Sequence, residues 1–180
     1  MVVVEGLGPP ASRVSMDREF AMHREARLIP GLMEAKPRAL PSMEFARERV
    51  AMNNPRVSAQ QAAEIAANLA TTGPDGKLYW NFDPSVPMVF VGQEDAFKYW
   101  PFVKCPTLIV NGDHSGEYWQ KIYPPMDGWT GGFARGELEE RVAVFPQGEL
   151  ARLAHSGHMA HFDEPERLAE LTLAFLQRQE

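Results

Sequence analysis

Short runs of apolar residues, each closed within a few positions by glycine or proline, most constrain the fold of this chain. These runs are Val2–Val4, Thr107–Val110 and Val142–Phe145. Most of their residues are β-branched, which favours strands over helices. Continuous apolar runs of this length are typical of strands buried on both faces of a parallel sheet. The sequence therefore predicts a sheet of about three parallel strands.

The segments between these runs are mainly helical in pattern. Ser58 and Gln61 form a capping-box pair ahead of the alanine-rich stretch Ala62–Ala70. Residues 72–76 read as a turn, and the alternation over Lys77–Phe82 predicts a short strand.

The C-terminal segment predicts an amphipathic helix that lies on the sheet. Asp163 is the expected N-cap, with Pro165 in the first turn. The apolar residues spaced to share one face are Leu168, Leu171, Phe175 and Leu176.

An order in which strands alternate with helices predicts an α/β fold with parallel strands. About a hundred residues separate the first two predicted strands, far more than a simple crossover needs. We therefore expect residues 1–10 and 101–180 to form a core and residues 11–100 to form an inserted helical cap.

Composition narrows the class of partner. The formal net charge of -6 would repel nucleic acid and anionic membrane surfaces at long range, so neither is expected as a partner. The single cysteine, Cys105, cannot form an internal disulfide, and no signal peptide or membrane-spanning run is evident. We expect a cytoplasmic protein that acts on a small molecule.

The tail of the chain carries the most specific motif. Residues 154–166 read AHSGHMAHFDEPE, and an apolar helix follows. This resembles the C-terminal signature of the α/β-hydrolase superfamily, in which the histidine after the glycine is the catalytic base. The resemblance implies that His158 has this role.

The same resemblance indicates two candidates for the catalytic acid. Residues 105–112 are similar to the family's penultimate strand, and the acid usual three residues after its glycine is replaced here by Ser115. Asp113 lies nearby, one residue after Gly112. Residues 2–10 look like the strand after the nucleophile elbow, where a subset that includes haloalkane dehalogenases carries its acid. Glu5 matches that place and is preferred over Asp113.

The nucleophile itself is missing from the expected pattern. The nearest look-alike to a Gly-x-nucleophile-x-Gly elbow, Gly112–Gly116, has the wrong spacing between its first glycine and its serine. In the family, the elbow precedes the strand with which this chain begins. The resemblance thus implies the latter half of a hydrolase for ester-like or related small substrates, inactive alone and without a cofactor. Ester, epoxide, lactone and halide chemistries stay open, because the nucleophile decides among them.

Two other classes of function remain open. The first strand would lie at an open sheet edge, which could pair with a missing N-terminal half or a second copy, or serve a non-catalytic interaction module. His155, His158 and His161 recur every third residue, and imidazole is a favoured zinc ligand. In a helix these three side chains would point in different directions, so we do not expect a metal site here.

Overall fold

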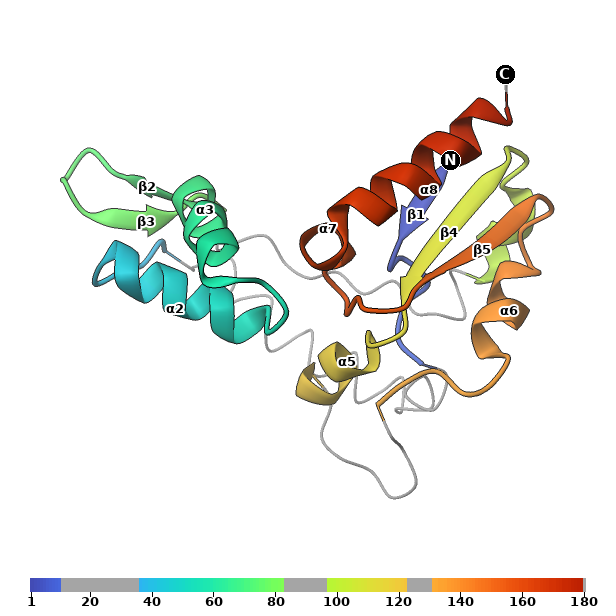
Figure 1. Cartoon of the computed structure of the whole chain (residues 1–180), viewed down its shortest axis with the longest axis horizontal. Helices are drawn as coiled ribbons and strands as arrows, with labels where there is room; N and C mark the ends of the chain where they lie inside the picture. The colour runs from blue at the N-terminus through green and yellow to red at the C-terminus, as the bar shows by residue number, and fades with distance from the viewer. Residues whose placement is uncertain (11–35, 83–96, 123–130, 180) are drawn as a thin grey trace. The chain divides into compact units, whose positions relative to one another are not determined.

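A computed structural model describes residues 1–10, 36–82, 97–122 and 131–179 of the chain. These residues fall into two compact units (Figure 1). Residues 1–10, 97–122 and 131–179 form the sheet unit, and residues 36–82 form the helical unit. The division into a core of residues 1–10 and 101–180 and a cap of residues 11–100 stays a prediction.

The sheet unit is built on three parallel strands. They are β1 (Val2–Val4), β4 (Thr107–Gly112) and β5 (Gly148–Leu153), in the order β1-β4-β5. Each neighbouring pair is parallel. The central strand β4 is buried at all six positions. The predicted α/β class and the predicted three-stranded parallel sheet are confirmed.

Helices cover both faces of this sheet, because successive side chains of β4 point to opposite sides. Ile109 packs in a cluster with Leu138 and Val142 of α6 (Glu137–Val142). Its neighbours Leu108 and Val110 pack instead with Phe175 of α8 (Pro165–Gln177). The two helices therefore lie on opposite faces of β4, as Figure 1 shows. This double cover explains why the sequence of β4 is continuously apolar.

The prediction of a strand over residues 142–145 is wrong. Val142 ends α6, Phe145 lies in the turn after it, and the strand is β5, which begins at Gly148. Leu138, Val142 and Phe145 have the i, i+4, i+7 spacing of one helix face and are buried in the same cluster. A four-residue apolar run could not be told from the end of a helix by its composition.

The C-terminal helix was predicted correctly in kind but not in its N-cap. A short helix, α7 (Ala160–Asp163), precedes α8, whose N-cap residue is Glu164 and whose first residue is Pro165. Phe175 is 1% exposed and anchors α8 on the sheet, whereas Leu176 is 48% exposed. Leu176 therefore lies outside the buried face on which the periodicity placed it.

The helical unit contains two packed helices and a hairpin. They are α2 (Met43–Asn53), α3 (Ala59–Leu69) and the antiparallel pair β2 (Ala70–Thr72) and β3 (Leu78–Trp80). The predicted capping box at the start of α3 and the predicted turn between the strands are confirmed. The core is made mostly of small residues, namely Ala46, Val50, Ala62 and Ala66. Small side chains let the two helices approach closely.

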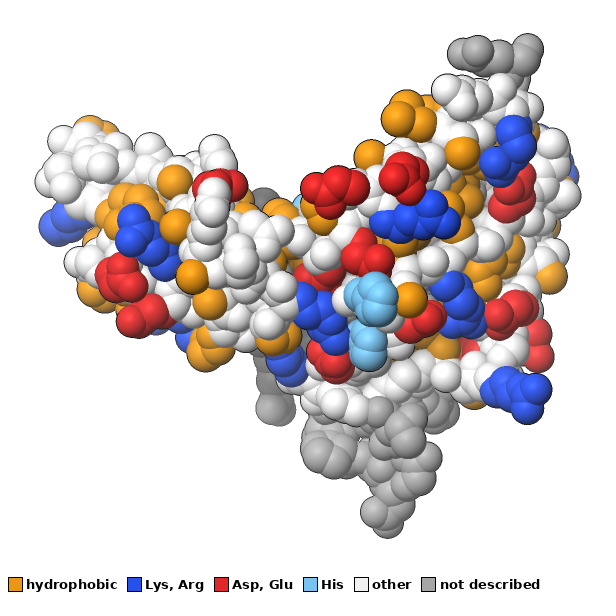
Figure 2. All heavy atoms as spheres, in the orientation of Figure 1, with side chains coloured by type: hydrophobic (Ala, Val, Ile, Leu, Met, Phe, Trp, Pro, Cys, Tyr) orange, Lys and Arg blue, Asp and Glu red, His pale blue; other side chains and the backbone are white. Residues whose placement is uncertain are grey.

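Two further helical segments complete the described elements. They are a 3₁₀ turn, η2 (Trp100–Phe102), and α5 (Gly116–Ile122). None of the helices in the described ranges is long and apolar enough to span a bilayer. On the face drawn in Figure 2, acidic and basic side chains are interspersed, so neither sign forms a continuous field there. Cytoplasmic location stays a prediction.

Phe175→Ala tests the packing of α8 on the sheet. We expect the free energy of unfolding to fall by about 3–5 kcal/mol, because the substitution leaves a cavity where a fully buried ring was. Urea denaturation measures this change. Leu173→Ala on the same helix is the control, since Leu173 is 59% exposed and its loss should cost within about 0.5 kcal/mol. Equal losses in both variants would contradict this placement of α8.

Candidate active site

The carboxyl ends of the three parallel strands bring together Glu5 and His158, two residues predicted from the sequence. Glu5 directly follows β1, Asn111 and Gly112 end β4, and His158 lies in the loop that follows β5. Parallel strands end at the same edge of a sheet, so residues far apart in the chain meet there. Glu5 and His158 are 153 residues apart and are in contact.

The contact joins the Glu5 carboxylate to the His158 imidazole. Glu5 Oε2 lies 3.2 Å from His158 Nδ1. The Glu5 side chain is 5% exposed and that of His158 is 22% exposed. A carboxylate can only accept this hydrogen bond, so Nδ1 carries the proton and Nε2 is left as the acceptor when the ring is neutral.

The second oxygen of Glu5 is held by the end of β4. Glu5 Oε1 accepts hydrogen bonds from the backbone N–H of Gly112 at 2.5 Å and from Nδ2 of Asn111 at 2.9 Å. A buried carboxylate needs such partners, because desolvation would otherwise disfavour its charge. These bonds aim the other oxygen at His158. Asn111 was not predicted as a site residue, and its place directly after a buried strand was the available signal.

Hydrogen bonds to two acidic side chains hold the loop that carries His158. The backbone N–H of His155 and the hydroxyl of Ser156 donate to Glu164 Oε2 at 2.8 and 2.9 Å. The N–H of Gly157 donates to Asp163 Oδ2 at 2.7 Å, so Asp163 holds this loop instead of capping α8. The two acids that follow the histidine, Asp163 and Glu164, thus hold its loop.

Close approach of this loop to β4 requires a glycine. A Cβ atom on Gly112 would lie 2.4 Å from the carbonyl oxygen of Ser156 and 2.6 Å from that of Gly157. The N–H of His114 donates to the Ser156 carbonyl at 2.9 Å across the same contact. Gly112 therefore lets the loop come near enough for His158 to reach Glu5.

Aromatic rings enclose the imidazole. The ring of Tyr118 stacks on His158, with centroids 3.9 Å apart and planes inclined by 11°. Trp119 meets the imidazole edge-on, with centroids 5.7 Å apart. Both come from α5. Neither residue was predicted from the sequence, because only the fold brings α5 beside the loop after β5.

Asp113, the alternative acid, faces a different partner. Its carboxylate lies 3.2 Å from Nη1 of Arg152 and is 42% exposed. Arg152 also binds Glu139 at 2.8 Å, and this bond lowers the pKa of Glu139 from its ordinary value. Ser115, at the position where the family usually has its acid, is buried and precedes α5. The structure thus brings Glu5, and not Asp113, to His158.

The three histidines of the tail do not form a common site. Among the residues that the structure describes, no three His, Cys, Asp or Glu side chains are grouped so as to hold a metal ion. His158 faces Glu5, whereas the ring of His161 packs against Phe162 with centroids 4.0 Å apart. The alternative of a His-cluster metal site therefore gains no geometric support.

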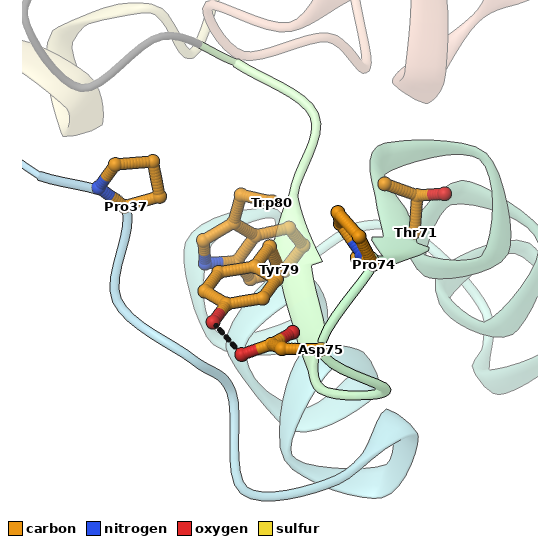
Figure 3. Close-up of a pocket in the computed structure, with 7 residues that line it drawn as sticks. Pro37, Thr71, Pro74, Asp75, Tyr79 and Trp80 are labelled. Atoms are coloured by element: carbon orange, nitrogen blue, oxygen red, sulfur yellow. Dashed lines mark hydrogen bonds between the residues drawn. The ribbon is translucent and has the colours of Figure 1, made fainter.

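The helical unit has a pocket of its own, of about 680 Å³ (Figure 3). Within it the hydroxyl of Tyr79 donates to Asp75 Oδ2 at 2.8 Å. This bond raises the pKa of Tyr79 and lowers that of Asp75 from their ordinary values. The lining residues are Pro37, Thr71, Gly73, Pro74, Asp75, Tyr79 and Trp80. None is a histidine or a strong nucleophile, so the pocket is separate in chemistry from the Glu5–His158 pair.

The state of the His158 ring gives a direct test of this geometry. We expect neutral His158 to carry its proton on Nδ1, because Glu5 accepts that hydrogen bond. The ¹⁵N chemical shifts of the ring nitrogens measure it. Glu5→Gln should shift the ring toward a mixture of tautomers, whereas Asp113→Asn should leave it unchanged. A ring protonated mainly on Nε2 in the wild type would contradict the assignment.

Gly112→Ala tests the close approach of the histidine loop. We expect the free energy of unfolding to fall by about 1–3 kcal/mol, because backbone atoms must move to admit the methyl group. Urea denaturation measures the loss, and the His158 ring shifts should move as well. Gly132→Ala is the control, since a Cβ there meets nothing within 4 Å. An unchanged His158 spectrum in Gly112→Ala would count against the role of Gly112.

Comparison with known proteins gives structural likeness only. No protein-family model and no curated protein sequence matches this chain. Among solved structures, a thioesterase domain from the curacin biosynthetic pathway matches with a TM-score of 0.63 at 20% identity, over 96% of this chain and 56% of that one. An E-2-(acetamidomethylene)succinate hydrolase matches with a TM-score of 0.61 at 17% identity, over 98% and 57%.

An esterase from Mycobacterium tuberculosis is similar to the same degree, with a TM-score of 0.61 at 16% identity over 98% of this chain and 51% of that one. The chain therefore spans little more than half the length of the solved structures it matches. Identities this low speak for the fold alone. The structural matches, together with the parallel sheet and the helices on both of its faces, show that the chain has an α/β-hydrolase-like fold.

Proposed function

We propose that this chain supplies the acid–base part of a hydrolase active site, with His158 as the base and Glu5 as the acid that orients it. The observation that carries the proposal is the 3.2 Å contact between Glu5 Oε2 and His158 Nδ1 at the carboxyl end of the sheet. The α/β-hydrolase-like fold supports it, since such sheets carry their chemistry at this edge.

The chemistry follows from the tautomer that Glu5 imposes. Nε2 of His158 takes the proton of a nucleophile or of water and later returns it to the leaving group. The carboxylate stabilises the imidazolium that forms between these steps. The substrate class is an ester-like or related small molecule, and no cofactor is required for this proton transfer. Asp113, bound to Arg152, is the weaker candidate for the acid.

The nucleophile, in this proposal, comes from a polypeptide segment beside β1. The N–H of Leu108 donates to the Met1 carbonyl and the N–H of Glu5 donates to the Val110 carbonyl, so the peptide groups that flank β1 face β4 at these two positions. Peptide groups alternate in direction along a strand, so those of Val2 and Val4 point to the other edge. The described residues place no strand there, and Val4 is 37% exposed.

A parallel strand added at this edge would end beside Glu5 and could present a nucleophile to His158. The matched structures are nearly twice as long as this chain, which leaves room for such a segment in a complete enzyme. We therefore propose a missing N-terminal half as the partner of β1. By itself the 180-residue chain should have negligible hydrolase activity.

A second candidate uses the same edge without chemistry. Edge strands recruit other chains unless charge, proline, a bulge or short length protects them. Val2–Val4 is short, but it contains no charged residue and no proline. A second copy of the chain could pair there and form a homodimer or a non-catalytic interaction module. Light scattering of the 180-residue chain distinguishes a dimer from a monomer.

The decisive activity test uses the longest polypeptide that its gene encodes around these residues. We expect it to hydrolyse a chromogenic short-chain ester, and His158→Ala to lower kcat/KM by about 10³-fold or more, because the substitution removes the proposed base. Glu5→Gln should lower kcat by about 10²–10⁴-fold, because the imidazole loses its orientation. Asp113→Asn is the matched control and should stay close to wild type.

Three outcomes bear on this proposal in different ways. A loss with Asp113→Asn but not with Glu5→Gln would move the acid to Asp113. Full activity of His158→Ala would refute the proposal that His158 is the base. Strong activity of the 180-residue chain alone, lost with His158→Ala, would show that the nucleophile lies within it.

A further inference from the structure

One buried cation in the sheet unit is directed at the segment that follows Glu5. Arg141, on α6, is 2% exposed. Its Nη1 donates to the carbonyl of Leu7 at 2.6 Å and, more distantly, to that of Gly8 at 3.4 Å. Its Nη2 donates to the carbonyl of Pro9 at 2.7 Å. The guanidinium therefore binds three consecutive carbonyls of one short segment.

Neighbouring groups compensate the charge of this cation. The carboxylate of Glu137 accepts from Arg141 Nη2, and its other oxygen accepts the N–H of Ala134 at 2.8 Å. The ring of Phe133 lies 4.9 Å from the guanidinium carbon, within cation–π range. Burial lowers the pKa of Arg141, and Glu137 opposes that shift. Among the described residues, the donors of this enclosed side chain bind the segment of residues 7–9 and the carboxylate of Glu137.

Glu5 is the residue that needs such an external restraint. Its φ of 54° lies in the left-handed region, which a non-glycine residue seldom adopts without support from its surroundings. On one side its N–H is bound to Val110 of β4 at 2.9 Å. On the other side Gly6 packs back against Val3, where a Cβ would lie 2.5 Å from Cγ1. The chain then enters the segment that Arg141 binds.

We propose that Arg141, with its partner Glu137, is a positioning residue: by binding the carbonyls of Leu7 to Pro9 it holds Glu5 in its left-handed conformation and so keeps the carboxylate on His158. This inference rests on the proposed function for its purpose. It concerns the geometry of the Glu5–His158 pair, which can be measured without turnover.

Packing alone does not account for the ion pair. A buried pair of charges can often be replaced by apolar residues of similar volume without loss of stability. Such a replacement would fill the same space beside Leu7 but would release the three carbonyls. Comparison of this double substitution with a core variant that is also destabilised therefore separates positioning from stability.

The experiment compares Arg141→Met/Glu137→Leu with wild type and with Phe145→Leu. Phe145 lies in the same core cluster, where its ring stacks on Trp100 at 5.0 Å. Thermal melting reports stability, and the ¹⁵N shifts of the His158 ring report its tautomer. We expect the double variant to melt below wild type, because the carbonyls of Leu7 to Pro9 lose their donors, and its His158 ring to become a mixture of tautomers. Phe145→Leu should melt at a lower temperature and keep the Nδ1–H tautomer.

A double variant that folds and keeps the wild-type His158 signature would overturn the proposal. If that variant does not fold, Arg141→Lys decides, because lysine keeps the charge beside Glu137 but cannot bind three carbonyls as a fork. Partial loss of the Nδ1–H tautomer in Arg141→Lys supports positioning, and an unchanged ring overturns it. Failure of the ester assay alone would refute the hydrolase proposal and leave these spectra standing.

Discussion

Parallel pairing of β1 with β4 is the constraint on which the candidate site depends. Val2, Val3 and Val4 pair with Leu108, Ile109 and Val110, so β1 ends level with Val110, two residues before the end of β4. That register places Glu5 beside Gly112, whose backbone N–H the carboxylate accepts. Side chains alternate along a strand, so a shift of one residue would turn Glu5 to the other face.

The same edge shows how the protein accommodates buried charge. Glu5 is 5% exposed and has three partners, one of them a backbone amide. Arg141 and Glu137 form a second buried pair on the opposite side of the turn that follows Glu5. Each charge is held by groups that would cost free energy if they were left without partners. The turn after β1 is therefore fixed by electrostatic contacts at both ends.

Much of this arrangement was predictable from local pattern. The strand over residues 107–110, the capping box of Ser58 and the C-terminal amphipathic helix all follow from side-chain type and spacing. The run Val142–Phe145 was wrongly predicted as a strand, because its two valines favour a strand. The spacing of Val142 and Phe145 from Leu138 is that of one helix face. The strand that the sheet uses, β5, has the mixed sequence GELARL. Its pairing with β4 outweighs its weak local preference.

The sequence by itself determined the α/β class and the place of β1 and β4, because these depend on neighbouring residues. Its resemblance to the α/β-hydrolase signature made Glu5, Asp113 and His158 the candidates. Only the tertiary structure showed which carboxylate contacts His158: Asp113 pairs with Arg152, while Glu5 meets His158. It also revealed that Tyr118 stacks on His158 and that Arg141 binds the backbone of the turn after β1. These contacts join segments far apart in the chain, and their distances follow from packing, which no local pattern encodes.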